Sequence, residues 1–360
     1  MPVLMLEMDD VRSSFPYLSQ CTYLNTATAG LAAPGQGAAA AEFYDIDKAQ
    51  GIQGMERWRA RADAARKELA SLLAVQAHSV HFVGSTTEAL NLIALSLPLS
   101  KGDRVVVAQD EFASVVLPWQ TLRVRGVEVV HVPIPREAER SEALAVAAAG
   151  ARVLAVSHVH WRTGTRVDLA RLSAACAKHG CRLIVDGAHA VGAVPIDARQ
   201  VDAYCAPVFK WLLSGFGLGF VTLSDSLAAQ LEPALRGYSN EPPSRSLSYS
   251  HVNYPGIYAL HAALVHLRTL GWQHIHTRVA SLAVHTAFML RQAGLDVLTP
   301  EGSHGGIVSF RHPHSGALVQ ALARQSIFVE DGGALVRVSP HFYNMKEEVD
   351  HFVSALKRVA

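Results

Sequence analysis

The feature that most constrains the fold is a series of short apolar runs that alternate with helical segments in the first half of the chain. The runs are rich in valine, leucine and isoleucine and predict strands at residues 104–108, 127–132, 153–157 and 182–186. One intervening helix is expected from Asp168, a residue suited to an N-cap, to Lys178, with Gly180 just past its end. Apolar strands separated by helices are typical of a parallel sheet covered on both faces. The sequence therefore predicts an α/β fold that binds its ligand at the carboxyl ends of the strands.

The pattern changes after about residue 255, where longer helices replace the alternation of strands and helices. Two helices and two short strands are expected there, at residues 257–270, 272–293, 306–310 and 335–339. They predict a smaller α+β domain, and the polar, proline-containing residues 241–246 are expected to form a loop before it. We place the large domain at residues 20–255 and build the small domain from residues 1–19 and 256–360.

Composition and charge give no support for several kinds of partner. Half of the 360 residues are apolar, 18% are charged and the formal net charge is +1, as in a folded protein without affinity for nucleic acid or an anionic membrane. The first residues lack the basic start of a secretory signal, and the alanine-rich segment 143–151 is too short to cross a membrane. We therefore expect a cytoplasmic protein.

The cysteines and histidines give little indication of a metal site. The four cysteines are scattered, which favours reduced structural thiols in a cytosolic protein. Two His-Xaa-His pairs, at residues 158–160 and 274–276, are compatible with metal binding. Alternation on a strand or a helix flank is the simpler interpretation, and no metal is expected.

Two charged residues stand where an α/β fold places its chemistry. Asp186 ends an apolar strand, and Lys210 follows the next short strand, at residues 202–206, with aromatic neighbours and a glycine-rich segment, residues 214–220, after it. A desolvated lysine has a lowered pKa and serves as an amine nucleophile. A carboxylate can keep a pyridinium nitrogen protonated, so that the ring accepts electrons. Together the two residues favour a pyridoxal 5′-phosphate (PLP) site with Lys210 as its Schiff-base residue.

Each of these features also has an ordinary structural interpretation. A strand-terminal aspartate often caps a helix or forms a turn, a lysine before tryptophan often extends to the surface, and glycines often form tight turns. The order of the three features along the chain favours the PLP site over these separate explanations.

Two further motifs complete a resemblance to a known family. Residues 23–27, Tyr-Leu-Asn-Thr-Ala, and residues 85–92, Ser-Thr-Thr-Glu-Ala-Leu-Asn-Leu, are similar to the opening motif and the phosphate loop of the class V aminotransferase superfamily. That superfamily of PLP enzymes also holds the cysteine desulfurases and the isopenicillin-epimerase-like proteins. The resemblance runs from about Tyr23 to Val353. It implies PLP fold type I, with a mostly parallel seven-stranded sheet between helices, and a homodimer with shared active sites.

The resemblance also implies roles for individual residues. Thr86 and Thr87, at a helix N-terminus, would bind the cofactor phosphate, for which the unpaired amides and the helix dipole are suited. A guanidinium is suited to two-point binding of a carboxylate. The resemblance further implies that Asn25 lines the substrate site, Asp186 pairs with the pyridine nitrogen and His189 contacts the phenolate oxygen of the ring. It also implies that Lys210 forms the Schiff base and that Arg337 binds the substrate carboxylate.

The sequence departs from the desulfurases of this family around the cofactor ring. Ala113 stands where they have a ring-stacking histidine, so we expect the adjacent Phe112 to help cover the ring. Trp161 replaces a common asparagine near the cofactor, and its indole would narrow the pocket.

Further departures concern the cofactor phosphate and the catalytic lysine. Pro207 and Phe209 replace a serine and a histidine just before Lys210, which removes a phosphate hydroxyl and a polar partner. The threonine that the neighbouring subunit lends to the phosphate is displaced, and His251 or Ser250 is expected to replace it.

The motifs indicate the chemistry at Cα but leave the product open. The leading interpretation is an aminotransferase for a small amino acid, in which the freed Lys210 removes the α-proton. A lyase or an epimerase shares the same site, and a catalytically silent PLP-binding protein is a further alternative. No cysteine follows Cys205, so the C-terminal loop cysteine of the desulfurases is absent and that activity is not expected. An unrelated nucleotide-binding protein lacks support, because no GxGxxG or P-loop lysine motif opens the first strand–helix unit.

Overall fold

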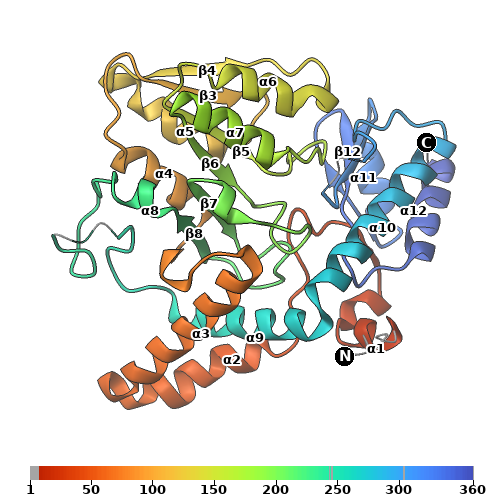
Figure 1. The fold of residues 1–360 in the computed structure, drawn as a ribbon. Helices are drawn as coiled ribbons and strands as arrows, with labels where there is room; N and C mark the ends of the chain where they lie inside the picture. Colours follow the sequence, from red (N-terminus) through yellow and green to blue (C-terminus); the bar gives the residue numbers. More distant parts are fainter. Residues whose placement is uncertain (1–7, 243, 245, 303–304, 360) are drawn as a thin grey trace.

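A seven-stranded sheet forms the centre of the molecule in the computed structural model, which describes residues 8–242, 244, 246–302 and 305–359 (Figure 1). The strands lie in the order β2 (Val80–Val83), β8 (Gly219–Leu223), β7 (Ala203–Pro207), β6 (Arg182–Asp186), β5 (Val153–Ser157), β3 (Arg104–Ala108) and β4 (Glu128–Val132). Only β8 is antiparallel to its neighbours within this sheet. The predicted strands are confirmed, and β4 begins one residue later than expected.

Helices cover both faces of the sheet. On one face α4 (Thr86–Ser96) packs against α5 (Ala113–Gln120), and on the other α6 (Arg140–Ala147) packs against α7 (Leu169–His179). Strand β3 contributes to two hydrophobic cores, one on each face of the sheet. Val105 and Val107 face the core beneath α4 and α5, whereas Val106 and Ala108 face the core beneath α6 and α7. This double cover explains why the predicted strands are apolar throughout.

The ends of α7 follow the sequence signals. The Asp168 side chain accepts a hydrogen bond from the amide of Arg171, and Gly180 follows the helix with a φ of 64°. The second feature suits glycine because a side chain is strained in that region. Both predicted ends of this helix are confirmed.

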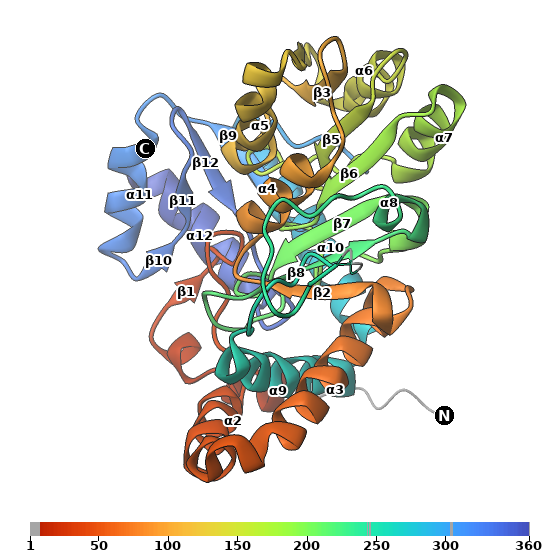
Figure 2. The same cartoon turned by 90° about the vertical axis from the view of Figure 1, so that its left-hand side faces the viewer.

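Three helices pack together at one end of the molecule (Figure 2). They are α2 (Gln36–Glu42), α3 (Met55–Leu73) and α9 (Tyr254–Leu270). A π-helical and a 3-10 segment, Phe43–Asp47 and Lys48–Gly54, join α2 to α3, and the short helix α8 (Asp225–Ala228) follows β8. The described residues of the predicted loop 241–246 lie outside helices and strands, while residues 243 and 245 are not among the described ones.

The C-terminal part builds a separate core on a three-stranded sheet in the order β11 (Glu330–Asp331), β12 (Leu335–Val338) and β9 (Val308–Arg311). Three helices belong to this part, α10 (Trp272–Gln292), α11 (Ser315–Ala323) and α12 (Lys346–Val359). The N-terminal helix α1 (Met8–Ser13) is tied to it, because Arg12 donates to Glu348.

The N-terminal segment pairs with the end of the chain. Strand β1 (Thr22–Tyr23) lies parallel to β10 (Ile327–Phe328), and Asn25 forms a β-bridge with Ser339. Strand β1 belongs to the predicted large domain and β10 to the predicted small domain, and the domain boundaries stay a prediction. Within the described ranges, no helix combines the length and apolar character that a membrane span needs.

Candidate active site

A cavity of about 290 Å³ lies where the large sheet meets the C-terminal sheet. Lys210 reaches it from the loop after β7, and His189 from the loop after β6. Parallel neighbouring strands end at the same sheet edge, so both loops open toward one place. Five predicted site residues line this cavity: Phe112, Trp161, His189, Lys210 and Arg337.

Lys210 is a lysine prepared to react as a neutral amine. Its Nζ lies 3.3 Å from Nε2 of His189. Burial lowers the pKa of Lys210 to about 8; Asp186 opposes this shift, and Arg337 adds to it. A lysine with this pKa is substantially deprotonated at mildly alkaline pH, whereas an ordinary lysine is not.

Asp186 and His189 are buried close to Lys210. The Asp186 carboxylate accepts a hydrogen bond of 2.7 Å from the amide of Ala188, and burial raises its pKa to about 6. Burial lowers the pKa of His189 well below its usual value, and its Nδ1 finds no partner among the described residues. A protonated ring nitrogen beside Asp186 would stabilise the carboxylate, which fits a pyridinium partner.

The predicted phosphate loop is the N-terminus of α4. Ser85 caps this helix by accepting from the amide of Glu88 at 3.0 Å. The Thr86 hydroxyl is buried and has no partner in the described part of the chain, whereas Thr87 pairs with Ser114 at 2.8 Å. A helix N-terminus with an unpaired buried hydroxyl fits a phosphate group.

Gly219 lets the phosphate loop approach the lysine loop. A Cβ at Gly219 would lie 3.2 Å from the carbonyl carbon of Ser85. Gly219 also pairs with Pro207, which ends β7 three residues before Lys210. The close packing of β8 against α4 therefore places the two predicted cofactor-binding segments side by side.

Arg337 lines the cavity and has only neutral hydrogen-bond partners. Its Nη1 donates to the carbonyl of Trp161 at 2.9 Å, and its Nη2 donates to the hydroxyl of Thr28 at 2.7 Å. Its Nε is buried without a partner in the described structure, and burial lowers its pKa. Such a cation lacks the carboxylate that a buried guanidinium ordinarily pairs with.

Asn25 lies near Arg337 but does not line the cavity. Its side-chain amide donates to Glu330 at 3.0 Å, and its Oδ1 is buried without a partner in the described part. Its role in substrate binding stays a prediction.

Phe112 and Trp161 form an aromatic wall. Their rings meet edge to face with centroids 5.5 Å apart, and Phe112 remains 42% exposed. The Trp161 indole donates to the carbonyl of Asp110 at 3.3 Å. Both residues are placed to contact a ligand in the cavity, and their predicted contacts with the cofactor ring stay predictions.

A buried charge network supports this wall. Arg140 donates to Asp110 at 2.6 and 3.0 Å and to Glu137 at 2.8 and 3.0 Å. Burial alone would raise the pKa of each carboxyl, but the hydrogen bonds from Arg140 together with the charges of Arg140 and His160 outweigh it and lower both pKa values. His160 lies beside the two carboxylates and completes a set with potential metal ligands. Arg140 already forms ion pairs with both carboxylates.

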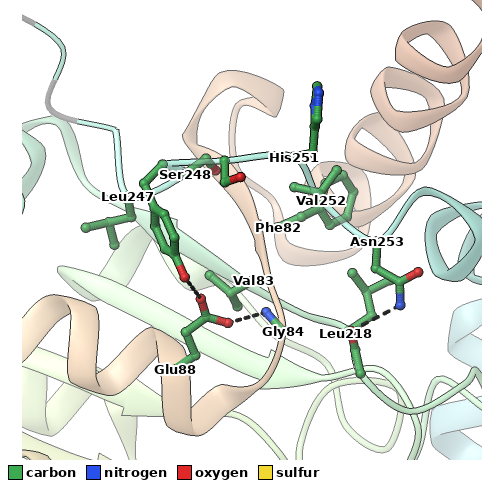
Figure 3. Close-up of a pocket in the computed structure, with 13 residues that line it drawn as sticks. Phe82, Val83, Gly84, Glu88, Leu218, Leu247, Ser248, His251, Val252 and Asn253 are labelled. Atoms are coloured by element: carbon green, nitrogen blue, oxygen red, sulfur yellow. Dashed lines mark hydrogen bonds between the residues drawn. The ribbon is translucent and has the colours of Figure 1, made fainter. Parts of the chain in front are cut away.

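His251 lies apart from the cavity that contains Lys210. It borders a second hollow of about 200 Å³, next to the phosphate loop, and Figure 3 shows its ring pointing away from Glu88 and Gly84. Its backbone amide donates to the Tyr238 hydroxyl at 2.6 Å, and its side chain is exposed. An exposed position suits contact with a second subunit, and the predicted contact of His251 with the neighbouring phosphate stays a prediction.

Sequence reasoning missed several residues that line the cavity, among them Thr28, Arg162 and Glu330. Thr28 follows the opening motif by one residue, and Glu330 lies in a Glu-Asp-Gly-Gly turn shortly before Arg337. Proximity in sequence to predicted site residues was a usable signal for both, whereas Arg162 had only its position next to Trp161.

Comparisons with known proteins agree with this geometry. The family model described as "Aminotransferase class-V" matches residues 23–352. The chain is 26% identical to the uncharacterized aminotransferase YcbU of Bacillus subtilis, over 97% of each protein. It is 28% identical to isopenicillin N epimerase of Streptomyces clavuligerus, over 81% of this chain and 83% of the epimerase. The apo cysteine desulfurase from Thermococcus onnurineus shares the fold, with a TM-score of 0.90 and 23% identity over 99% of this chain and 98% of that one.

The fold, the lysine-bearing cavity and the family match together define a PLP-dependent enzyme of fold type I. The chain belongs to the class V aminotransferase family, because the family model covers most of its length. Its cofactor is PLP, and the unpartnered atoms of Thr86 and His189 fit that group. Cysteine desulfurases are also among its relatives, so the expectation that this chain lacks that activity stays a prediction.

Proposed function

We propose that this protein is an aminotransferase for a small amino acid. The observation that carries the proposal is the arrangement of Lys210 and Arg337 on one cavity, where Arg337 has no carboxylate partner in the described structure. An α-carboxylate bound at Arg337 would supply that partner and bring the amino group toward Lys210.

The proposed reaction gives each residue of the site a separate role. Thr86 and the first amides of α4 would hold the cofactor phosphate, and Asp186 would keep the pyridine nitrogen protonated. The bound PLP supplies an electron sink for negative charge at Cα. Lys210, as a neutral amine, would take the proton from Cα and deliver it to the cofactor carbon instead of back to Cα.

His189 would hold the side chain of Lys210 in position. Its Nε2 lies 3.3 Å from Lys210 Nζ, and burial keeps the imidazole neutral. A neutral imidazole can exchange a hydrogen bond with either protonation state of the amine. The lowered pKa of Lys210 supports an enzyme rather than a catalytically silent PLP-binding protein.

Epimerisation is the second candidate, because isopenicillin N epimerase is among the relatives. It requires the Cα proton to return from the opposite face, so a second proton carrier would be needed. A lyase requires a leaving group on the substrate side chain. Both reactions begin with the same loss of the Cα proton, so the product decides between them.

One experiment separates these reactions. The PLP-loaded protein is incubated in D₂O with single amino acids, with and without a 2-oxo acid as amino acceptor. Transamination requires the acceptor for sustained formation of the new oxo acid and releases no ammonia. Ammonia release indicates elimination, and deuterium at Cα with inversion indicates epimerisation. Absence of exchange and product with every amino acid would contradict the proposed function.

We also propose that the protein works as a homodimer in the cytoplasm. The exposed His251 beside the phosphate loop supports a contact with a second subunit, because it does not reach the Lys210 cavity of its own chain. If His251 serves the phosphate of its neighbour, His251→Ala is expected to weaken PLP affinity. Unchanged affinity would remove this part of the proposal.

A further inference from the structure

Glu330 places a negative charge directly beside the predicted carboxylate-binding arginine. In the C-terminal sheet, Glu330 of β11 and Arg337 of β12 are opposite residues in the antiparallel register. Side chains of opposite residues lie on the same face of a sheet, about 5 Å apart at Cβ. Both line the cavity that contains Lys210. Any amino acid bound at Arg337 therefore meets the carboxylate of Glu330 as well.

The two opposite charges share a hydroxyl instead of forming an ion pair. Within the described residues, no Glu330 oxygen lies within 4.0 Å of an Arg337 nitrogen. The Thr28 hydroxyl accepts from Arg337 at 2.7 Å and donates to Oε2 of Glu330 at 2.6 Å. Thr28 therefore keeps the cation and the anion apart, and each keeps its charge for a ligand.

One oxygen of Glu330 is available to a ligand. Its Oε2 accepts hydrogen bonds from the Thr28 hydroxyl at 2.6 Å and from the side-chain amide of Asn25 at 3.0 Å. Its Oε1 accepts no hydrogen bond from any described residue. An accessible carboxylate oxygen at the wall of a binding cavity favours a donor group on the ligand.

The neighbouring carboxylate does not compete for this role. Asp331 turns toward the start of α11, where it accepts from the Ser315 hydroxyl at 2.6 Å and from the amide of Gly333 at 3.0 Å. The Nη2 of Arg162 donates to the carbonyls of Gly332 and Gly333, while its Nε is buried without a partner in the described structure. Asp331 also lines the cavity, but it lies opposite Val336 in the register, so its side chain projects from the other face of the sheet than those of Glu330 and Arg337.

The rest of the wall suits a positive charge. Phe112, Trp161 and Phe209 line the same cavity. The faces of aromatic rings attract cations, and a desolvated cation gains most from them. An anionic side chain on the substrate would instead be repelled by the carboxylate of Glu330.

We propose that Glu330 is a specificity-determining residue that selects amino acids with a cationic side chain, such as an ammonium, guanidinium or quaternary ammonium group. The inference rests on the proposed function, because it assigns the α-carboxylate to Arg337. It names the substrate class of that same site.

Matched amino acids of nearly equal shape test the proposal. The PLP-loaded protein is assayed for Cα deuterium exchange with arginine against citrulline, and with lysine against norleucine. The parent is expected to prefer the charged member by roughly tenfold or more in kcat/KM, the effect of one charged hydrogen bond. Equal use of arginine and citrulline by the parent would overturn the proposal.

Glu330→Gln separates specificity from positioning. The amide oxygen still accepts from Thr28 and Asn25, but the charge is gone. We expect the arginine-to-citrulline ratio to fall to near one, while citrulline retains most of its kcat/KM. A uniform loss for both amino acids would indicate a positioning residue and contradict the proposal. Asp331→Asn is the matched control, and it is expected to keep the parental ratio because its carboxylate faces Ser315.

A binding measurement keeps this test independent of turnover. In Lys210→Ala protein loaded with PLP, calorimetry compares the affinities for arginine and citrulline, with and without Glu330→Gln. A charge preference that disappears with Glu330→Gln supports the selectivity even if no reaction is found, in which case only the proposed function fails. Equal affinities overturn the selectivity while leaving the proposed function intact.

Discussion

Two arginines near the cavity have opposite surroundings. Arg140 is 1% exposed and donates to the carboxylates of both Asp110 and Glu137. Arg337 is also buried, but its partners are a carbonyl and a hydroxyl, and its Nε has none within the described ranges. Burial acts to lower the pKa of both guanidinium groups; at Arg140 the hydrogen bonds that it donates to Glu137 and Asp110, together with their negative charges, reverse this effect.

The difference distinguishes a structural charge from a functional one. A buried charge is stable when its own neighbours neutralise it, and costs stability when they do not. Arg140 completes its pairing within the chain, so it stabilises the segment that carries Trp161. Arg337 leaves its pairing incomplete, which the protein tolerates because a ligand carboxylate can complete it.

The largest expected effect is a loss of activity when the reactive lysine of the cavity is replaced. Lys210→Ala removes the proposed proton carrier at Cα, and turnover is expected to fall by roughly a thousandfold or more. Steady-state rates with the preferred amino acid measure the loss, and urea denaturation shows whether folding is retained. Lys178→Ala, at an exposed position on α7, is the control that should keep full activity. Substantial activity in Lys210→Ala would remove Lys210 from the chemistry.

The next effect separates the two arginines directly. Arg140→Met leaves two carboxylates without their cation, and we expect a loss of about 3 kcal/mol in unfolding free energy, at the low end for a buried pair because Asp110 is partly exposed. Arg337→Met removes a cation without a paired carboxylate, so its stability is expected to stay within about 1 kcal/mol of the parent. Urea denaturation of both cofactor-free variants measures this. Equal losses in the two variants would show that the comparison is wrong.

The smallest expected effect is a dependence of a rate on pH. It contrasts Lys210, a cation that titrates, with Arg337, a cation that stays charged. The lowered pKa of Lys210 means that its neutral amine increases as pH rises, reaches half of the total at about pH 8 and levels off only above that. The rate of PLP attachment to the cofactor-free protein should follow that curve. Asp186→Asn should move the midpoint lower, because the Asp186 charge raises the pKa of Lys210. A midpoint near the 10.5 of an ordinary lysine would contradict the burial argument.

Much of the large sheet was predictable because local patterns carry it. Strands buried on both faces require apolar residues at every position, so β3, β5 and β6 are visible as uninterrupted runs. The insertion of antiparallel β8 between β2 and β7 was not visible. Strand order depends on which segments meet in space, and no local pattern in β8 records its neighbours.

The candidate site divides in the same way. Lys210, Asp186 and the Thr86 loop follow strands or begin a helix, so their sequence context indicated their position. The contact of Thr28 with Glu330 joins residues 302 positions apart and depends on the pairing of β11 with β12. Sequence alone gave no reason to join them.

The sequence by itself determined the α/β class, the lysine–aspartate pair and the PLP family, because periodicity and motif order are local properties of a chain. The tertiary structure decided which charges are neutralised and which remain free. Arg140 lies in a charged segment and Arg337 in an apolar strand, yet both are buried, and packing provides carboxylates to the one and a hydroxyl to the other. The availability of a charge depends on its neighbours in space, and those neighbours come from distant parts of the chain.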